Sequence, residues 1–203
     1  MSPELVALAV HDLKNELGGL ETELAELERD PSPAGLRRAR ATCEQLRREM
    51  VAFLTLYRGD ALQALVDDES PRELLASMCG SDPGGLVVEL GPGERAPPFW
   101  YFDPRLVRLA LDAALHNARR YARQRIVLDA EQRGDCLVLS IDDDGPGLAA
   151  GAGAHDAWST GLGTELCRAV ARAHRLEGRH GEVRLFDRPD RLQGGARFEL
   201  ILP

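Results

Sequence analysis

Residues 3–29 have the sequence PELVALAVHDLKNELGGLETELAELER, in which apolar side chains recur at alternating intervals of four and three residues. The members of this series are Val6, Val10, Leu13, Leu17, Leu20, Leu24 and Leu27. Such spacing is typical of a helix that packs along one narrow apolar seam, as in a coiled coil. We therefore predict a long amphipathic helix at the start of the chain.

A second apolar series follows the break at Asp30-Pro31-Ser32-Pro33 and repeats the same spacing. Its members are Leu36, Ala39, Cys43, Leu46, Met50, Phe53 and Tyr57. The short break predicts an antiparallel helical hairpin, and the pairs Ser2-Pro3 and Ser32-Pro33 suit a cap and a first helical position. Because two narrow seams bury little surface, we expect residues 1–58 to form a dimeric four-helix bundle in a homodimer. The alternative is a hairpin that packs on the rest of its own chain.

Composition excludes several classes of protein. The chain has 203 residues, 44% hydrophobic composition and a formal charge of −8, so it can bury a core but lacks the clustered cations that nucleic acid or an anionic membrane requires. Its four cysteines form no Cys-x-x-Cys pair, which fits neither a zinc site nor a disulfide framework. Without a long apolar span or a leader segment, we expect a cytoplasmic protein whose signal comes from a separate sensor protein.

The pattern changes along the rest of the chain. We expect a polar linker over residues 59–70 and a second domain over 71–203. The expected helices span 72–78, 104–122 and 162–174, and the expected strands span 86–90, 126–130, 136–142, 183–186 and 196–202. In helix 104–122 the residues expected to face the core are Leu106, Leu109, Ala110, Ala113, Leu115 and Ala118. This order predicts an α+β domain with helices on one face of a mixed sheet.

Three motifs in the second domain are suited to a nucleotide. Asp142-Asp143-Asp144-Gly145-Pro146-Gly147 follows a strand, where a carboxylate can accept from an exocyclic amine and glycines allow close backbone approach. Ser159-Thr160-Gly161-Leu162-Gly163-Thr164 opens a helix whose free amides can meet phosphates. Asn117-Ala118-Arg119-Arg120-Tyr121 places a neutral oxygen for Mg²⁺ beside a cation. On its own, an acidic Gly-Pro-Gly turn is more often a simple loop.

The first helix carries a fourth motif, His11-Asp12-Leu13-Lys14-Asn15. His11 lies one position after the seam residue Val10, so it should point away from the bundle, and Asn15 lies one turn later on the same face. Taken alone, His11 is simply a solvent-facing helical histidine. Its value as a candidate depends on the other motifs.

In this order, the segments 11–15, 117–121, 143–147 and 161–163 resemble the catalytic core of two-component sensor histidine kinases. The resemblance covers nearly the whole chain, and the closing residues 194–203 also look like that family's terminal strand. It implies a dimerisation and phosphoacceptor hairpin followed by a Bergerat-type ATP-binding domain, an α/β sandwich with a mixed sheet.

The resemblance implies a role for each candidate residue of the hairpin. His11 would take the γ-phosphoryl group, and Asp12 would orient or deprotonate its imidazole. Asn15 would position water for dephosphorylation of a partner aspartyl phosphate.

The resemblance also implies the nucleotide contacts of the second domain. Asn117 would hold Mg²⁺, Arg120 would lie near the phosphates, and Tyr121 would lie near the nucleotide. Asp143 would accept from the adenine amine. The remaining residues of the cofactor pocket would be Gly145, Gly147, Gly161, Leu162 and Gly163.

The function so implied is an ATP-dependent protein histidine autokinase, with ATP and Mg²⁺ as cofactors, that passes phosphate from His11 to an aspartate of a response-regulator receiver domain. The chain departs from the family at Glu16, where proline is frequent, at Ala113, where Asn is frequent, at Ser159, which stands in place of a glycine, and in the short lid from Leu148 to Thr160. The reduced lid, the short length and the missing sensor motivate a second hypothesis. That hypothesis is a histidine phosphotransferase with a kinase-like fold that relays phosphate between receiver domains without ATP. A serine kinase of the anti-sigma type would share the nucleotide domain but would leave the heptad hairpin unexplained.

Overall fold

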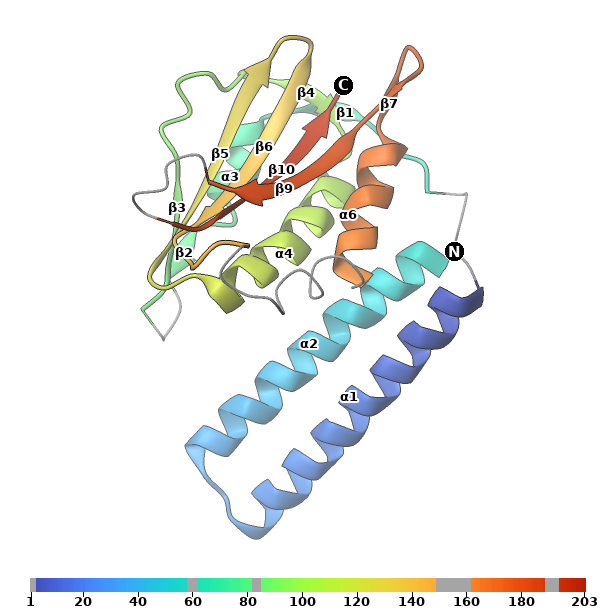
Figure 1. Ribbon diagram of the computed structural model, residues 1–203, viewed down its shortest axis with the longest axis vertical. Helices are drawn as coiled ribbons and strands as arrows, with labels where there is room; N and C mark the ends of the chain where they lie inside the picture. The colour runs from blue at the N-terminus through green and yellow to red at the C-terminus, as the bar shows by residue number, and fades with distance from the viewer. Residues whose placement is uncertain (1–2, 58–61, 82–84, 149–161, 189–193) are drawn as a thin grey trace. The chain divides into compact units, whose positions relative to one another are not determined.

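The computed structural model describes residues 3–57, 62–81, 85–148, 162–188 and 194–203 (Figure 1). The chain divides into two compact units, Met1–Ala61 and Leu62–Pro203, and each is presented by itself. Among the helices in the described ranges, none has both the length and the apolar character needed to cross a bilayer.

The first unit is the predicted helical hairpin. Helix α1 spans Pro3–Arg29, helix α2 spans Pro33–Tyr57, and the two pack antiparallel along their length (Figure 1). Helix α2 begins as the sequence predicts, because the Ser32 hydroxyl accepts a hydrogen bond from the Gly35 amide at 3.1 Å and Pro33 follows it. The hairpin is thus fixed by its own turn as well as by its seam.

Only alternate members of the predicted seam contact the other helix of the hairpin. On α1, Leu13, Leu20 and Leu27 are buried or half-buried, whereas Val10, Leu17 and Leu24 remain 46–50% exposed. Helix α2 repeats this alternation, since its seam members Leu36, Cys43, Met50 and Tyr57 are exposed. The described hairpin therefore presents a second apolar stripe, which we call the outer stripe, formed by these four residues together with Val10, Leu17 and Leu24.

A six-stranded sheet forms the centre of the second unit, with the strand order β2-β3-β5-β6-β10-β9. Its strands are β2 (Gly80–Ser81), β3 (Val87–Leu90), β5 (Arg125–Arg133), β6 (Cys136–Asp143), β9 (Glu182–Asp187) and β10 (Ala196–Leu202). Strands β3 and β5 are parallel and the other neighbours are antiparallel, so the predicted mixed sheet is confirmed. Two further ribbons pair β1 (Asp67–Glu69) with β4 (Trp100–Phe102), and β7 (Arg175–Leu176) with β8 (Arg179–His180).

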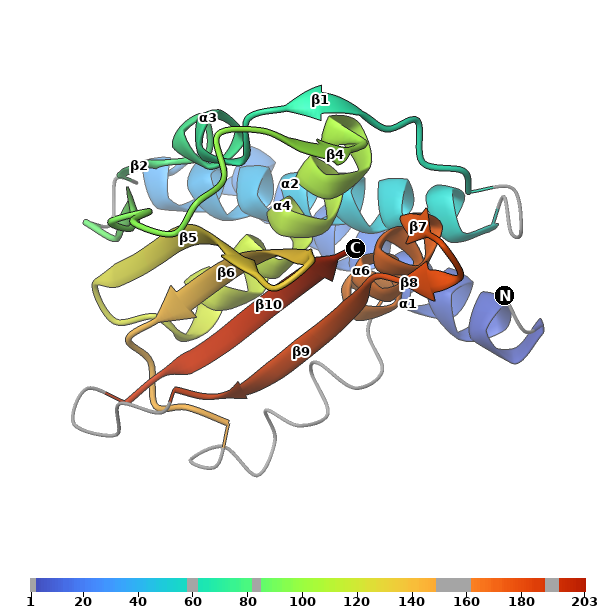
Figure 2. The same cartoon turned by 90° about the horizontal axis from the view of Figure 1, so that it is seen from above.

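Helices cover one face of this sheet, as Figure 2 shows. Helix α4 (Pro104–Tyr121) and helix α6 (Leu162–Ala173) lie side by side against β6, β9 and β10, and the short α3 (Pro71–Ala76) packs near β3 and β5. Alternate residues of the strands, among them Ile126, Leu128 and Ile141, are fully or almost fully buried beneath the helices. The α+β fold expected from the sequence is confirmed.

Two details of the sequence prediction need correction. The most deeply buried residues of α4 include Val107, Leu111 and Ala114, whereas Leu106, Leu109 and Ala113 are only half-buried. The reason is that α4 packs against both the sheet and α6, which moves and widens its buried stripe. The segment expected to be a linker over 59–70 contains strand β1, whose three acidic residues carry no strand propensity of their own.

Helix α4 starts at a buried junction. The Asp103 side chain caps the helix by accepting from the amides of Arg105 and Leu106 at 3.0 and 3.1 Å, and it also accepts from the Leu65 amide at 2.9 Å. The Asp103 amide donates to His174 Nε2 at 3.0 Å. The first turn of α4 is therefore tied both to the start of this unit and to the end of α6.

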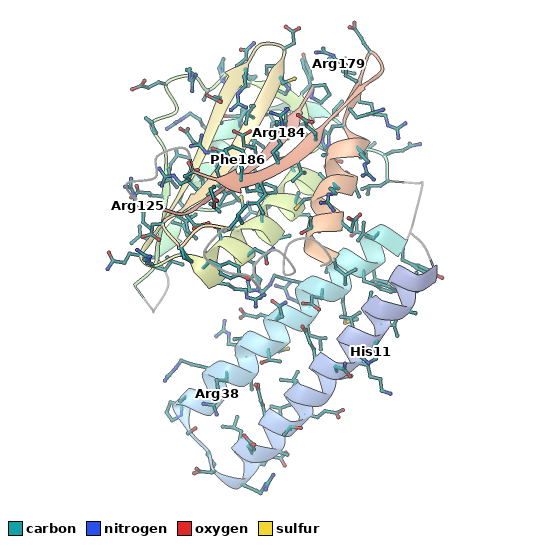
Figure 3. The ribbon with its side chains drawn as sticks, viewed as in Figure 1. His11, Arg38, Arg125, Arg179, Arg184 and Phe186 are labelled. Carbon is teal, nitrogen blue, oxygen red and sulfur yellow. The ribbon has the colours of Figure 1, made fainter. Side chains whose placement is uncertain are left out.

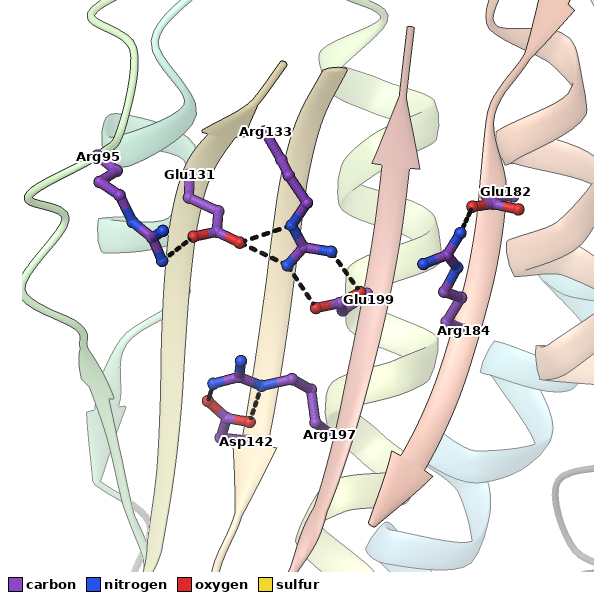
Figure 4. A network of polar contacts seen from close by, with 8 residues as sticks. All are labelled: Arg95, Glu131, Arg133, Asp142, Glu182, Arg184, Arg197 and Glu199. Atoms are coloured by element: carbon purple, nitrogen blue, oxygen red, sulfur yellow. Dashed lines mark hydrogen bonds and ion pairs between the residues drawn. The ribbon is translucent and has the colours of Figure 1, made fainter. Parts of the chain in front are cut away.

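The opposite face of the sheet carries a ladder of ion pairs (Figure 4). Glu199 on β10 is only 2% exposed and binds Arg133, which also binds Glu131. Arg197 makes two hydrogen bonds of 2.6 Å to Asp142. These pairs link three neighbouring strands and raise the pKa of both arginines, chiefly through their hydrogen bonds to the carboxylates.

Candidate functional site

The site of the second unit is centred on Asp143, the last residue of β6. It lies opposite Ile126 on β5, on the face of the sheet that the helices cover, and it is 7% exposed. Its Oδ1 atom accepts from the amides of Gly145 at 2.8 Å and Ala196 at 3.3 Å. From the described residues Oδ2 receives no hydrogen bond, so this oxygen is open to a ligand.

The electrostatic environment of Asp143 matches a recognition role. Burial raises the pKa of this carboxyl, and the neighbouring charges of Asp144 and Asp142 raise it further, while the amides of Gly145 and Ala196 act to lower it. A ligand N–H placed against Oδ2 would relieve this unfavourable environment. A buried acceptor of this kind discriminates strongly in favour of a ligand that carries the matching donor.

Gly145 brings the end of α4 against this turn. A Cβ atom at Gly145 would lie 2.5 Å from the Tyr121 carbonyl oxygen and 2.7 Å from Asp143 Oδ1. No residue other than glycine fits at this distance. Glycine is thus required at position 145 because Tyr121 and Asp143 pack closely around its backbone.

Gly147 differs from Gly145 in its backbone. It has φ +81°, a left-handed conformation that favours glycine, and a Cβ atom here would lie 2.7 Å from Asp187 Oδ1. The same Asp187 oxygen accepts from the Leu148 amide at 2.5 Å. The sequence does not predict a role for Asp187, because this residue lies 39 residues from its partner Leu148 and belongs to no local motif beyond the end of the β9 alternation.

The glycine pair before β10 also belongs to the site. Gly195 has φ +97°, and a Cβ atom there would lie 1.9 Å from the Asp143 carbonyl oxygen; at Gly194 the nearest atom would be the Gly145 carbonyl oxygen at 3.0 Å. The sequence motif drew attention to this pair only as part of a terminal strand. Its position shows that these glycines pack directly against the Asp143–Gly145 turn.

Asp144 closes the connection from α4 to β5. Its carboxylate accepts from the amides of Arg123, Gln124 and Arg125 at 2.7–3.2 Å. Burial acts to raise the pKa of Asp144, but these backbone donors together lower it below its usual value. Asp144 therefore has a structural role beside Asp143, and it fixes the end of α4 relative to the turn.

The remaining candidate residues lie on α4 and at the start of α6. Asn117 is half-buried, one turn before Tyr121, and Arg120 is exposed, with its guanidinium carbon 5.7 Å from the centre of the Tyr121 ring. Gly163 lies in the first turn of α6, where a Cβ atom would meet Ala113 Cβ on α4 at an ordinary 3.7 Å. Leu162 is the first residue of α6, and Gly161 lies outside the described residues.

These residues fit a purine nucleotide. Asp143 Oδ2 suits an exocyclic amine, and the first turn of α6, a kind of element that favours phosphate, packs beside the turn of α4 that precedes Asn117. The described residues contain no group of three or more His, Cys, Asp or Glu side chains that could hold a metal. Asn117 offers an amide oxygen, a type of ligand that Mg²⁺ accepts.

The hairpin carries a separate polar pair. His11 is exposed on α1 (Figure 3), and Asn15 Nδ2 lies 3.2 Å from its Nδ1 and 3.4 Å from its Nε2. The outward position predicted from the heptad phase is confirmed. Asp12 belongs to α1, but its side chain lies outside the described residues.

Comparison with known proteins gives one family. Residues 102–203 match the family model described as histidine kinase-, DNA gyrase B- and HSP90-like ATPase. The chain is similar to the sensor histidine kinase CpxA of Escherichia coli K12, with 26% identity over 216 aligned positions that cover 95% of this chain and 45% of that protein. It is also similar to the sensor protein KdpD of the same strain, with 32% identity over 117 residues that cover 51% of this chain and 12% of that protein. The chain thus spans less than half the length of either relative.

Solved structures agree. The ATP-binding domain of PrrB from Mycobacterium tuberculosis is 27% identical with a TM-score of 0.51, covering 68% of this chain and 97% of that one. The histidine kinase AdeS of Acinetobacter baumannii has a TM-score of 0.65 at 18% identity, covering 95% of this chain and 96% of that one, and so shows the same fold. The chain belongs to the histidine kinase-, DNA gyrase B- and HSP90-like ATPase family and has the catalytic core of a two-component sensor histidine kinase.

Proposed function

We propose that the chain is an ATP-dependent histidine autokinase that phosphorylates His11 and passes the phosphoryl group to an aspartate of a response-regulator receiver domain. The observation that carries this proposal is the presence, on one chain, of an exposed His11–Asn15 pair and a buried Asp143 whose Oδ2 is open. The hairpin over residues 1–58 and the ATP-binding domain over 71–203 would be joined by residues 59–70.

In the proposed reaction an unprotonated ring nitrogen of His11 attacks the γ-phosphorus of ATP. The bond from that phosphorus to the bridging oxygen breaks, and ADP leaves with the electron pair. Asp12 orients the imidazole, Asp143 holds the adenine amine, and Arg120 and Tyr121 lie near the phosphates and the nucleotide. When bound at Asn117, Mg²⁺ supplies charge neutralisation on the phosphates. Positioning supplies the rest of the rate enhancement.

Two partners complete the proposal. One solved relative, the histidine kinase ThkA, has a TM-score of 0.66 at 13% identity, covers 99% of this chain and 61% of that one, and was determined in complex with the response regulator TrrA. A receiver domain is accordingly the acceptor that we propose for the phosphoryl group on His11. Asn15 would position water in the reverse, phosphatase direction. A second copy of the chain would cover the outer stripe of the hairpin and form a homodimer.

The proposal is tested by incubating the full chain with γ-labelled ATP and Mg²⁺. We expect acid-labile, base-stable label on the wild-type protein and none on His11→Gln. His180→Gln removes another exposed histidine, on β8, and should label like wild type. Label that persists in His11→Gln would contradict the assignment of the acceptor.

The alternative, a histidine phosphotransferase that uses no ATP, makes the opposite prediction. It expects no binding of Mg-ATP and phosphorylation of His11 only from a phosphorylated receiver domain. Micromolar binding of Mg-ATP that is lost in Asp143→Asn would exclude this alternative, because the amide of Asn cannot replace the carboxylate as a pure acceptor.

A further inference from the structure

The turn that follows Asp143 is held at both of its ends by carboxylates. Asp143 Oδ1 binds the Gly145 amide at 2.8 Å, and Asp187 Oδ1 binds the Leu148 amide at 2.5 Å. Pro146 has no N–H to donate. The two carboxylates thus bind the first and the last backbone donors of residues 145–148, and they come from strands β6 and β9, which β10 separates in the sheet.

Gly147 is matched to the second of these carboxylates. Its φ of +81° turns the backbone toward β9, and the missing side chain leaves room for Asp187 Oδ1, which would lie 2.7 Å from a Cβ atom. Glycine at position 147 therefore allows the backbone conformation in which the Leu148 amide reaches Asp187.

The base of the β9–β10 hairpin holds Asp187 in place. Asp187 ends β9 opposite Ala196, whose amide binds Asp143 Oδ1 at 3.3 Å. The Arg188 amide donates to the Gly195 carbonyl at 3.1 Å directly after it. Asp187 is thus linked to the Asp143 carboxylate through its strand partner Ala196 and the backbone bond from Arg188 to Gly195.

We propose that Asp187 is a positioning residue for nucleotide binding, which acts through the backbone of Gly147 and Leu148 and not by contact with the nucleotide. By fixing the far end of the turn, it keeps Gly145 against Asp143 Oδ1 and so leaves Oδ2 directed at the ligand. The inference rests on the proposed function for the identity of the ligand, Mg-ATP.

The test compares three variants of the full chain by titration with Mg-ATP. Asp187→Ala removes the acceptor, and we expect the Kd to rise about tenfold, as for loss of one hydrogen bond to a charged acceptor. Asp187→Asn keeps a carbonyl acceptor of the same reach, and we expect a Kd within about threefold of wild type. Asp135→Ala, at a side chain 87% exposed in the β5–β6 turn, removes the same charge and should bind like wild type.

The kinetic constants for ATP distinguish a role of Asp187 in positioning the turn from a general loss of structure. In autophosphorylation we expect Asp187→Ala to raise the KM for ATP about tenfold and to leave kcat within about twofold, because the turn binds the nucleotide and not the phosphoacceptor. Equal losses in Asp187→Ala and Asp187→Asn, or wild-type affinity in Asp187→Ala, would overturn the inference.

Two further measurements keep the inference testable even if the chain uses no ATP. Hydrogen exchange at the Leu148 amide should be faster in Asp187→Ala than in wild type, and exchange at the Gly145 amide should rise with it, because the turn then loosens from Asp143. In a double-mutant cycle, the damage done by Gly147→Ala should be smaller in the Asp187→Ala background, because the clash with Oδ1 is gone. Unchanged exchange at Leu148, or strict additivity, would show that Asp187 does not hold this turn. Failure of nucleotide binding in the wild type would instead contradict the proposed function alone.

Discussion

Replacing Gly145 by alanine tests the packing that joins the Asp143 turn to helix α4. The new Cβ atom would lie 2.5 Å from the Tyr121 carbonyl oxygen, and ordinary contact begins at 3.4 Å, so the backbone must move by nearly 1 Å. Gly145 is absent from the residues with positive φ, so alanine brings no conformational strain of its own. The whole effect therefore comes from the clash and from the hydrogen bond that the movement weakens.

The magnitude follows from these two contributions. Overpacking of this degree costs about 1–3 kcal/mol, and stretching the bond from the Gly145 amide to the Asp143 carboxylate adds part of another 1.5–3 kcal/mol. We expect a loss of about 3 kcal/mol in the free energy of unfolding. For a unit of this size that lowers the melting temperature by about 10 °C.

Tryptophan fluorescence is a suited assay, because both tryptophans of the chain, Trp100 and Trp158, belong to the second unit. The matched control is Gly163→Ala, where the nearest atom would be Ala113 Cβ at 3.7 Å and φ is not positive. Alanine there should leave the melting temperature unchanged or raise it slightly, since it favours helix by about 1 kcal/mol over glycine. A Gly145→Ala protein that melts within 2 °C of wild type, or as low a melting temperature for Gly163→Ala, would refute the reasoning.

Three further predictions concern other parts of the chain. His174 accepts from the Asp103 amide, and burial lowers its pKa, so the folded chain binds a proton at this residue less readily than the unfolded chain. The free energy of unfolding should therefore fall between pH 7.5 and 5.5, by at most about 1.4 kcal/mol; urea titrations at the two pH values should show the loss in wild type and a smaller one in His174→Gln. Glu199→Gln should lower the free energy of unfolding, measured in urea, by about 1–2 kcal/mol, because this carboxylate is buried with Arg133. Glu182→Gln, at an exposed ion pair, should lower it by less than about 0.5 kcal/mol. Equal losses in the two variants would contradict the role given to burial. Leu17→Asp, in the outer stripe, should convert a dimer to monomers in sedimentation velocity, and a wild-type protein that is already monomeric would contradict the proposed homodimer.

The hairpin was predictable because its information is local. Seam residues repeat every three or four positions, and the capping serine and proline stand next to each other, so Ser32-Pro33 marks the start of α2 without any tertiary knowledge. The same phase argument placed His11 on the exposed face. The longer strands were also found: β5 alternates buried and less buried residues over most of its length, and β6 is a nearly continuous run of buried residues.

What the sequence could not supply are contacts between distant segments. Strands β1 and β4 have three residues each, and only their mutual pairing makes them strands. Gly147 was assigned to the approach of a ligand, whereas its missing side chain accommodates Asp187, a residue with no local motif. Periodicity alone also gave the wrong phase for part of α4, because that helix has two packing partners.

Through the junction at Asp103, helix α4 connects the start of the second unit to the turn that follows Asp143. The Leu65 amide, near the point where the chain enters the second unit, is bound by the same carboxylate that caps the first turn of the helix. The last turn of this 18-residue helix, about 27 Å away, carries Tyr121 against Gly145. A displacement of residues 62–65 would thus act on one end of a stiff helix whose other end contacts the turn that follows Asp143, the turn to which we assign the nucleotide.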